Sequence, residues 1–156
     1  MVTEPEPQKT EIAEVVARLF HALDDRDWAT VHTVTAEHID VDYPSKQGGP
    51  ERLSAHAFVT GLREFLPGFD ETHHLLGPIV VDRPSQESAT ARFHARVTHL
   101  VADQDAPLWT IGCHYTFGLT YLDGSWRISS SRVRVLYDEG NRDIEQLARV
   151  RATAPG

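Results

Sequence analysis

Two adjacent histidines, His73 and His74, stand near the start of the stretch ETHHLLGPIVVD. An unperturbed imidazole titrates near pH ~6.5, so either could be a catalytic base, a pH sensor or a metal ligand. A surface pair without a special role is a further interpretation. The stretch is typical of a strand, in which successive side chains point to opposite faces. One metal therefore cannot take both rings, and only one ring can face a cavity. Alternation does not say which, because Leu75 and Leu76 are both apolar.

Three more polar or reactive side chains fall on the apolar faces of two predicted strands, residues 88–102 and 108–122. Alternation places His99 on the apolar face of the first, and Cys113 and Tyr115 on that of the second. Each also has a purely structural interpretation. His99 could be a core histidine bonded to backbone, and Cys113 could be a small apolar residue that fills the core. Tyr115 could pack its ring in the core with its hydroxyl at the rim. Asp24, at the end of a predicted helix, could be a solvated or capping acid.

The elements that would position these residues can be read from hydrophobic periodicity. Thr10 is a plausible cap for a helix with one apolar face, made of Ile12, Val15, Val16, Leu19, Phe20 and Leu23. A short helix over 28–34, a strand over 39–43 and a helix capped by Ser54 follow. Strands are then predicted over 72–82, 88–102, 108–122 and 125–137, with a hairpin turn at Asp123-Gly124. Helices segregated from antiparallel strands indicate an α+β fold, a cone curled over the first helix with an apolar mouth.

Length and composition limit the organisation and the partners. The 156 residues predict one domain over 10–140, a disordered tail over 1–9 and a loose, at most briefly helical, tail over 141–156. A net charge of -8 argues against a nucleic-acid or anionic-membrane partner. The single cysteine allows no intrachain disulfide and no cysteine-based zinc site. With no signal-peptide pattern in MVTEPEPQKT and no long apolar run, we expect a cytoplasmic protein that neither spans nor binds a membrane.

Three segments together resemble the NTF2-like superfamily. They are LFHALDDRDWATVHTVTAEHIDVDYPS, THHLLGP and YLDGSWRISSSRVRV, within a similarity that covers about Thr10 to Asn141. The similarity is to the SnoaL-like branch, which holds scytalone dehydratase, bile-acid dehydratase and polyketide cyclases. This resemblance implies a curved antiparallel sheet wrapped by N-terminal helices around a deep apolar pocket, in agreement with the cone argued from the pattern.

The resemblance to scytalone dehydratase implies four catalytic residues. Asp24 in LDDRDW matches the catalytic Asp after the first helix, and Tyr43 in the Asp-Tyr pair matches a catalytic Tyr. The Thr-His-His run matches the strand opening that carries the first catalytic histidine, which selects His74. His99 matches the second one if a single residue is gapped.

The substrate-binding positions are implied less closely. Cys113 and Tyr115 fall near a Ser and an Asn of the template, and Arg134 in Val-Arg-Val has a counterpart on the last strand. The chain also departs from the family. Leu23 stands where scytalone dehydratase has a second catalytic Tyr, and Leu19 stands where the bile-acid enzyme has its Tyr. These departures leave the reaction open while keeping the Asp-His core.

The function implied is that of a cofactor-free and metal-free lyase or isomerase, dehydratase- or cyclase-like, acting on a small hydrophobic hydroxy-ketone of polyketide or steroid type. His74 would remove a proton next to the carbonyl, while Asp24 fixes the tautomer and stabilises the imidazolium. Tyr43 would donate to the developing oxyanion. His99 would protonate the leaving hydroxyl or orient a water.

Two other functions remain open. An epoxide hydrolase of this fold would need an Asp-Arg-Asp arrangement, for which Arg134 is available but no second inward Asp is evident. A non-catalytic binding or association module is the third interpretation, because a fold does not determine a function. The resemblance also implies a homodimer or homotrimer, paired through the outer face of the sheet.

Overall fold

The computed structural model describes residues 7–43 and 49–154, and three of the four α-helices in this part lie in the first half of the chain. The helices are α1 (Pro7–Asp25), α2 (Trp28–Val34), α3 (Ala55–Arg63) and α4 (Asp143–Thr153), with a 3-10 helix η1 (Leu66–Gly68). The strands are β1 (Thr35–Asp42), β2 (Glu51–Ser54), β3 (Glu71–Leu76), β4 (Val80–Asp82), β5 (Ser88–Leu100), β6 (Leu108–Leu122) and β7 (Ser125–Gly140). The predicted α+β class is confirmed.

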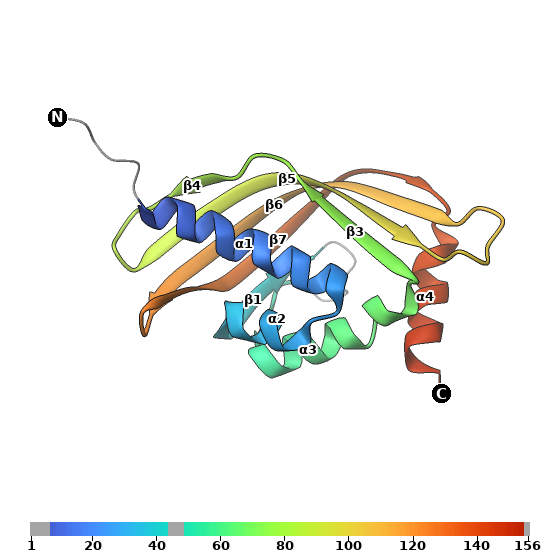
Figure 1. The fold of residues 1–156 in the computed structure, drawn as a ribbon, viewed down its shortest axis with the longest axis horizontal. Helices are drawn as coiled ribbons and strands as arrows, with labels where there is room; N and C mark the ends of the chain where they lie inside the picture. The colour runs from blue at the N-terminus through green and yellow to red at the C-terminus, as the bar shows by residue number, and fades with distance from the viewer. Residues whose placement is uncertain (1–6, 44–48, 155–156) are drawn as a thin grey trace.

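The strands that the structure describes form one seven-stranded sheet in the order β2-β1-β7-β6-β5-β3, with β4 also paired to β5. The sheet is curved, and α1, α2 and α3 lie on one side of it (Figure 1). Its pairs are antiparallel except that β1 runs parallel to β7. No hairpin joins these two strands, so nothing local fixes their relative direction. The sequence pattern does not predict β2, whose residues ERLS are mainly polar.

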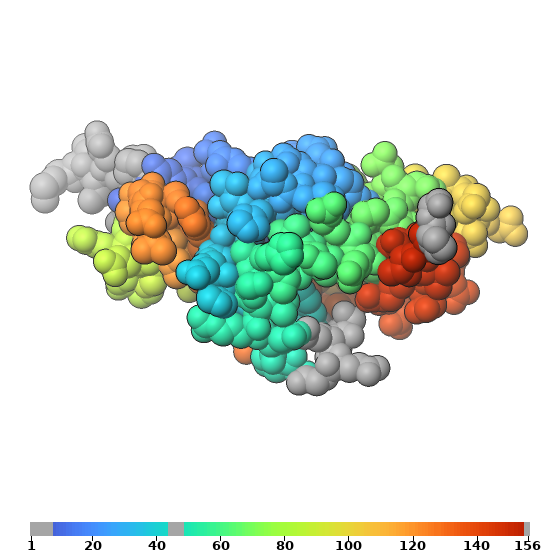
Figure 2. All heavy atoms as spheres, turned by 90° about the horizontal axis from the view of Figure 1, so that it is seen from below, coloured from blue at the N-terminus to red at the C-terminus, as the bar shows by residue number. Residues whose placement is uncertain are grey.

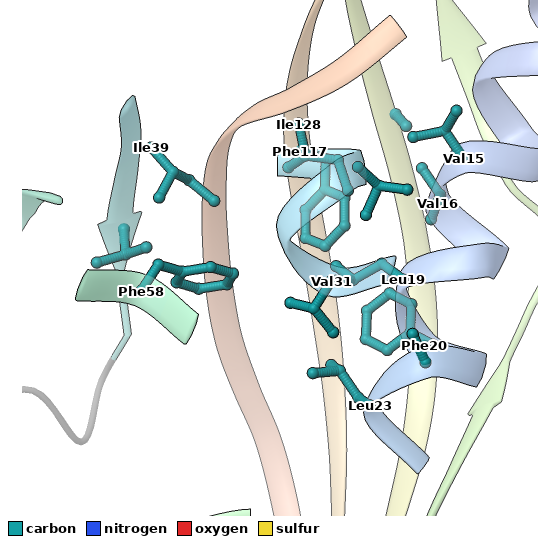
Figure 3. Packing of buried hydrophobic residues seen from close by; sticks show 14 of the residues in the cluster. Val15, Val16, Leu19, Phe20, Leu23, Val31, Ile39, Phe58, Phe117 and Ile128 are labelled. Carbon is teal, nitrogen blue, oxygen red and sulfur yellow. The ribbon is translucent and has the colours of Figure 1, made fainter. Parts of the chain in front are cut away.

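The core lies between α1 and the inner face of the long strands. The predicted apolar face of α1 is confirmed, with relative exposures of 0–9% for Ile12, Val15, Val16, Leu19, Phe20 and Leu23. Figure 3 shows five of these side chains, Val15, Val16, Leu19, Phe20 and Leu23, on the side of α1 that faces Phe117 and Ile128 of the sheet. Phe20 stacks on Phe117 at a centroid distance of 5.8 Å and meets Phe93 edge-on at 5.6 Å. This packing fixes the position of α1, and therefore of its last turn, against the sheet.

Turn chemistry accounts for two local features of the strands. Asp123 and Gly124 have φ values of 53° and 81°, the left-handed conformation that a tight hairpin between β6 and β7 requires. The single strand predicted over 72–82 is instead two strands, β3 and β4. Gly77 and Pro78 separate them, because proline has no N–H to donate to the ladder.

Helices cover parts of both segments that the sequence pattern predicts as tails. Residues 7–9 belong to α1, and the rest of the expected N-terminal tail lies outside the described residues. Residues 143–153, expected as a loose tail, form α4 with Ile144 and Ala148 fully buried. Figure 2 shows α4 against the segment that contains η1. The contact is close, because a Cβ on Gly68 would overlap the carbonyl of Ala148. No helix in these described ranges is long and apolar enough to cross a membrane.

Candidate functional site

The last turn of α1 and strand β3 bring Asp24 and His74 together. Along β3, Thr72 is buried, His73 is exposed and His74 is turned inward, so one histidine faces each side as alternation predicts. His74 Nδ1 lies 2.6 Å from Asp24 Oδ1. The side chains of His74 and Asp24 are 7% and 23% exposed. The histidine selected by the resemblance is therefore the one that contacts the aspartate.

The partners of Asp24 fix the tautomer of His74. Asp24 Oδ1 accepts from the Thr72 hydroxyl at 3.0 Å, and Oδ2 accepts from the backbone N–H of His74 at 2.9 Å. Burial would raise the pKa of Asp24, but its hydrogen bonds to His74 and Thr72, with the charge that His74 carries when it is protonated, hold the pKa below 3.8. An ionised carboxylate only accepts, so Nδ1 carries the hydrogen and Nε2 of the neutral ring keeps its lone pair. The pair has the geometry of a general base with an orienting carboxylate.

Two tyrosines lie on the same side of the sheet as this pair. The Tyr43 hydroxyl donates to Ser131 Oγ at 3.2 Å, and burial raises the pKa of Tyr43. Burial also raises the pKa of Tyr115 well above its ordinary value, helped by the neighbouring Cys113 and Tyr43. Both phenols therefore keep their hydrogens near neutral pH and can serve as donors.

Phe20 connects the tyrosine region with the Asp-His pair. Its ring lies 5.1 Å from the His74 ring and 5.2 Å from the Tyr115 ring, between centroids. Tyr115 in turn stacks on Phe93 at 5.2 Å. Phe20, which fills the core beneath α1, therefore also forms part of the surroundings of His74.

His99 is held as a neutral core histidine. Its side chain is 4% exposed, Nδ1 donates to the Trp109 carbonyl at 3.0 Å, and its ring stacks on Trp109 at 4.4 Å. Burial, with smaller contributions from the charges of His74 and Arg26, lowers the pKa of His99 to about 4. This geometry is that of a core histidine bonded to backbone, the structural interpretation considered from the sequence. His99 is also the register partner of Thr72, which places it beside the pair.

The residues expected to bind substrate separate into two groups. Cys113 is 2% exposed and packs on the inner face with Ala95 and Val97, and burial raises the pKa of its thiol to about 11. Arg134 does not join this group. It is exposed and pairs with His114, so it lies on the face of the sheet opposite to Cys113. The alternation of apolar and basic residues in the sequence RVRV already contained the signal for this placement.

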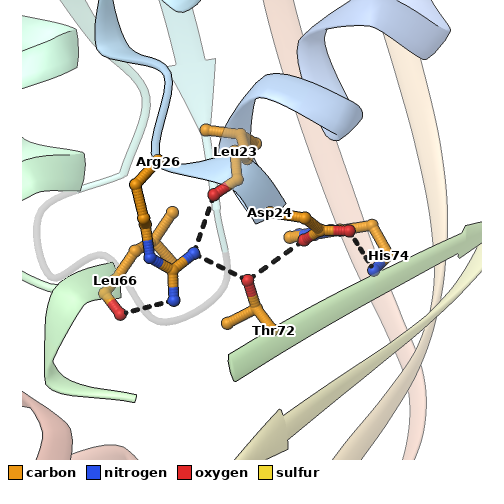
Figure 4. Close-up of polar contacts among 6 residues, drawn as sticks. All are labelled: Leu23, Asp24, Arg26, Leu66, Thr72 and His74. Carbon is orange, nitrogen blue, oxygen red and sulfur yellow. Dashed lines mark hydrogen bonds and ion pairs between the residues drawn. The ribbon is translucent and has the colours of Figure 1, made fainter. Parts of the chain in front are cut away.

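The sequence reasoning missed two residues beside the Asp-His pair: Thr72, which contacts Asp24, and Arg26, which contacts Thr72. Arg26 Nη1 donates to Thr72 Oγ1 at 2.8 Å, and the same hydroxyl donates to Asp24 (Figure 4). For Thr72 a signal existed, since it stands two residues before His74 and therefore on the same face of the strand. For Arg26 there was none, because it stands among acids in DDRD, a run that is typical of a solvated turn.

The walls around the pair are mainly apolar. A small cluster of Ala95, Val97 and Cys113 continues the inner face beside Leu76 and Tyr115. A hollow of about 310 Å³ is lined in part by residues that alternate away from His74, among them Leu75, His94, Arg96 and Tyr137, and in part by Leu76, Ala95 and Cys113. Its lining does not include His74 or Asp24. The deep apolar pocket therefore stays a prediction. Within residues 7–43 and 49–154, no group of three or more His, Cys, Asp or Glu could hold a metal ion.

Comparison with solved structures shows the same fold in other proteins. The Kfla4162 protein from Kribbella flavida superposes with a TM-score of 0.84 at 23% identity, covering 92% of this chain and 99% of that one. A scytalone dehydratase-like protein from Novosphingobium aromaticivorans has a TM-score of 0.74 at 18% identity, covering 86% and 88%. A hexachlorocyclohexane dehydrochlorinase, LinA-type3 from Novosphingobium barchaimii, has a TM-score of 0.74 at 12% identity, covering 87% and 91%.

The family comparison agrees with the structural one. No curated protein matches the sequence. The model of the SnoaL-like domain matches residues 7–132, from the start of α1 into β7. The NTF2-like cone expected from the resemblance is thereby confirmed, and the chain belongs to the SnoaL-like domain family.

Proposed function

We propose that this protein is a cofactor-free lyase or isomerase that removes a proton next to a carbonyl group of a small hydrophobic substrate. The observation that carries the proposal is the Asp24–His74 pair, with Nδ1 held at 2.6 Å from the carboxylate and the ring 7% exposed. Two of the structural neighbours bear the names of elimination enzymes, a dehydratase and a dehydrochlorinase, which supports a lyase over a plain binder. A dehydratase- or cyclase-like reaction on a polyketide- or steroid-like hydroxy-ketone is the specific form proposed.

In the proposed reaction, His74 Nε2 takes the α-proton and the C–H electrons move toward the carbonyl oxygen. The resulting imidazolium is stabilised by Asp24, which is ionised before the reaction begins. The hydroxyl of Tyr115, or that of Tyr43 after it turns from Ser131, donates to the developing oxyanion and stabilises the transition state. The enolate then expels the β-hydroxyl, which leaves as water once it has received a proton.

His99 fits one of its two expected roles better than the other. With a pKa of about 4 it is neutral near pH 7, so it has no imidazolium proton to give the leaving group. Its donor nitrogen is taken by the Trp109 carbonyl, which leaves the ring fixed in one orientation. We propose that His99 orients a water or the substrate, and that the proton for the leaving group comes from the His74 imidazolium, directly or through water.

The test is solvent exchange on a panel of hydroxy-ketones and cyclic ketones in D₂O, followed by NMR of the α-proton. We expect His74→Gln to slow exchange by roughly 10²–10⁴-fold, the usual contribution of a general base. His73→Gln is the matched control, because it changes the neighbouring exposed ring on the opposite face and should leave exchange unchanged. Absence of exchange by the unmodified protein on every probe, or full exchange by His74→Gln, would contradict the proposal.

The competing functions make different predictions in the same experiment. Arg134, the candidate arginine of an epoxide hydrolase, lies on the outer face and so lends that function no support. A non-catalytic binding module would show ligand-induced chemical shifts without exchange. The homodimer or homotrimer implied by the resemblance stays a prediction, which sedimentation velocity of the purified protein would test.

A further inference from the structure

Arg26 occupies a backbone position that favours glycine. It directly follows α1 with φ of 57°, and the N–H of Asp27 donates to the Ala22 carbonyl at 2.8 Å, as in a Schellman cap. Glycine is the usual residue at such a position, because a side chain there is strained. A non-glycine residue in this conformation is retained where its surroundings hold it. For Arg26, the contacts of its side chain account for this backbone conformation.

The guanidinium of Arg26 joins three elements beside the site. Nη1 donates to the Leu23 carbonyl of α1 at 2.7 Å and to Thr72 Oγ1 of β3 at 2.8 Å. Nη2 donates to the Leu66 carbonyl of η1 at 2.9 Å. Figure 4 shows the side chain reaching back under the end of α1 toward β3. The group is thus held in one orientation by acceptors from separate parts of the chain.

Thr72 links Arg26 to Asp24, and the direction of its two hydrogen bonds follows from the chemistry of the donors. A guanidinium carries only donors and stays charged, so Thr72 Oγ1 must accept from Arg26. The single hydroxyl hydrogen of Thr72 is then left for Asp24 Oδ1, 3.0 Å away. Thr72 is 5% exposed, so water does not compete freely for it. The chain of donors therefore runs from Arg26 through Thr72 to the carboxylate that holds His74.

We propose that Arg26, acting through the Thr72 hydroxyl, is a positioning residue that fixes the orientation of the Asp24 carboxylate and so keeps His74 Nε2 free to accept a proton. The catalytic consequence rests on the proposed function, but the effect on Asp24 does not. A purely structural role, in which Arg26 only ties α1 to η1 and β3, is the competing explanation.

The test uses variants that remove one link at a time. Thr72→Val keeps the branched shape and removes the hydroxyl, and Thr72→Ser, which keeps the hydroxyl, is its matched control. Arg26→Gly removes the guanidinium and suits the positive φ, so the turn itself is not disrupted. Circular dichroism and thermal melting of each variant report the fold. The decisive readout needs no substrate: it is the titration of the Asp24 carboxyl carbon by ¹³C NMR.

We expect the pKa of Asp24 to rise by roughly one unit in Thr72→Val, which removes the donor to the carboxylate, and to stay in place in Thr72→Ser. We expect it to rise in Arg26→Gly as well, because the guanidinium that directs the Thr72 hydrogen toward Asp24 is lost. On an exchange-active ketone, we expect kcat to fall about 10-fold or more in Thr72→Val and in Arg26→Gly with KM little changed. An unchanged Asp24 titration in both variants, or a lowered melting temperature as the only effect, would overturn the proposal. A raised pKa of Asp24 together with no activity in any variant or in the unmodified protein would uphold the positioning role and reject the proposed reaction.

Discussion

Replacing His99 by a residue that does not titrate should remove a defined part of the acid sensitivity of the fold. His99 is 4% exposed and its pKa falls from 6.5 to about 4, first because burial disfavours the charged ring. The unfolded chain therefore takes up a proton at this residue between pH 6.5 and about 4, whereas the folded protein does not. Since stability rises with pH wherever the unfolded state binds more protons, this contribution is complete above pH 6.5 and is lost as the pH falls toward 4.

The magnitude follows from the width of that window. A shift from 6.5 to about 4, at about 1.4 kcal/mol per pKa unit, corresponds to a loss of about 3 kcal/mol across the window. That is a large part of the ~5–15 kcal/mol by which a domain of this kind is usually stable. Groups such as Asp24 also titrate in acid, but they do so both in the unmodified protein and in a His99 variant. Their contributions therefore cancel in the difference between the two unfolding free energies.

The experiment is urea unfolding of the protein and of His99→Gln at closely spaced pH values between about 7.5 and 4.5. Glutamine was chosen because its amide can still donate to the Trp109 carbonyl, the partner of His99 Nδ1. Loss of the stacking on Trp109 should lower the stability of the variant by the same amount at every pH. We expect the advantage of the unmodified protein over the variant to shrink by about 3 kcal/mol toward acid. A pH-independent difference would refute the reasoning that His99 is buried in the neutral form.

Two further predictions concern the C-terminal helix. Gly68→Ala should lower the melting temperature and loosen α4, because the added Cβ would overlap the Ala148 carbonyl. Gly61→Ala is the control: Gly61 lies in α3 with open space around it, so this change should leave the melting temperature unchanged or raise it. Ile144→Ala should cost ~2–4 kcal/mol in urea unfolding, because the side chain is fully buried where α4 meets the domain, and a cost near zero would show that α4 contributes nothing to stability.

The sequence alone determined the parts of this protein that depend on local periodicity. The apolar face of α1, the inward face of β5 and the hairpin at Asp123-Gly124 all follow from side-chain spacing and turn chemistry. Alternation also required His73 and His74 to face opposite sides, and the structure has them so. The motif resemblance then selected His74 and Asp24, which the structure brings within hydrogen-bonding distance.

Only the tertiary structure decided the features that depend on how distant elements meet. The parallel pairing of β1 with β7 joins strands that no turn connects. The burial of α4 rests on few apolar side chains, Ile144 and Ala148 among them, and Ala148 lies against Gly68 of η1. The hydrogen bonds of Arg26 and Thr72 join the end of α1, β3 and η1, and no spacing in the sequence encodes them. Local spacing fixes which way a side chain points from its own element, whereas the distance between two side chains is fixed by the packing of the whole domain.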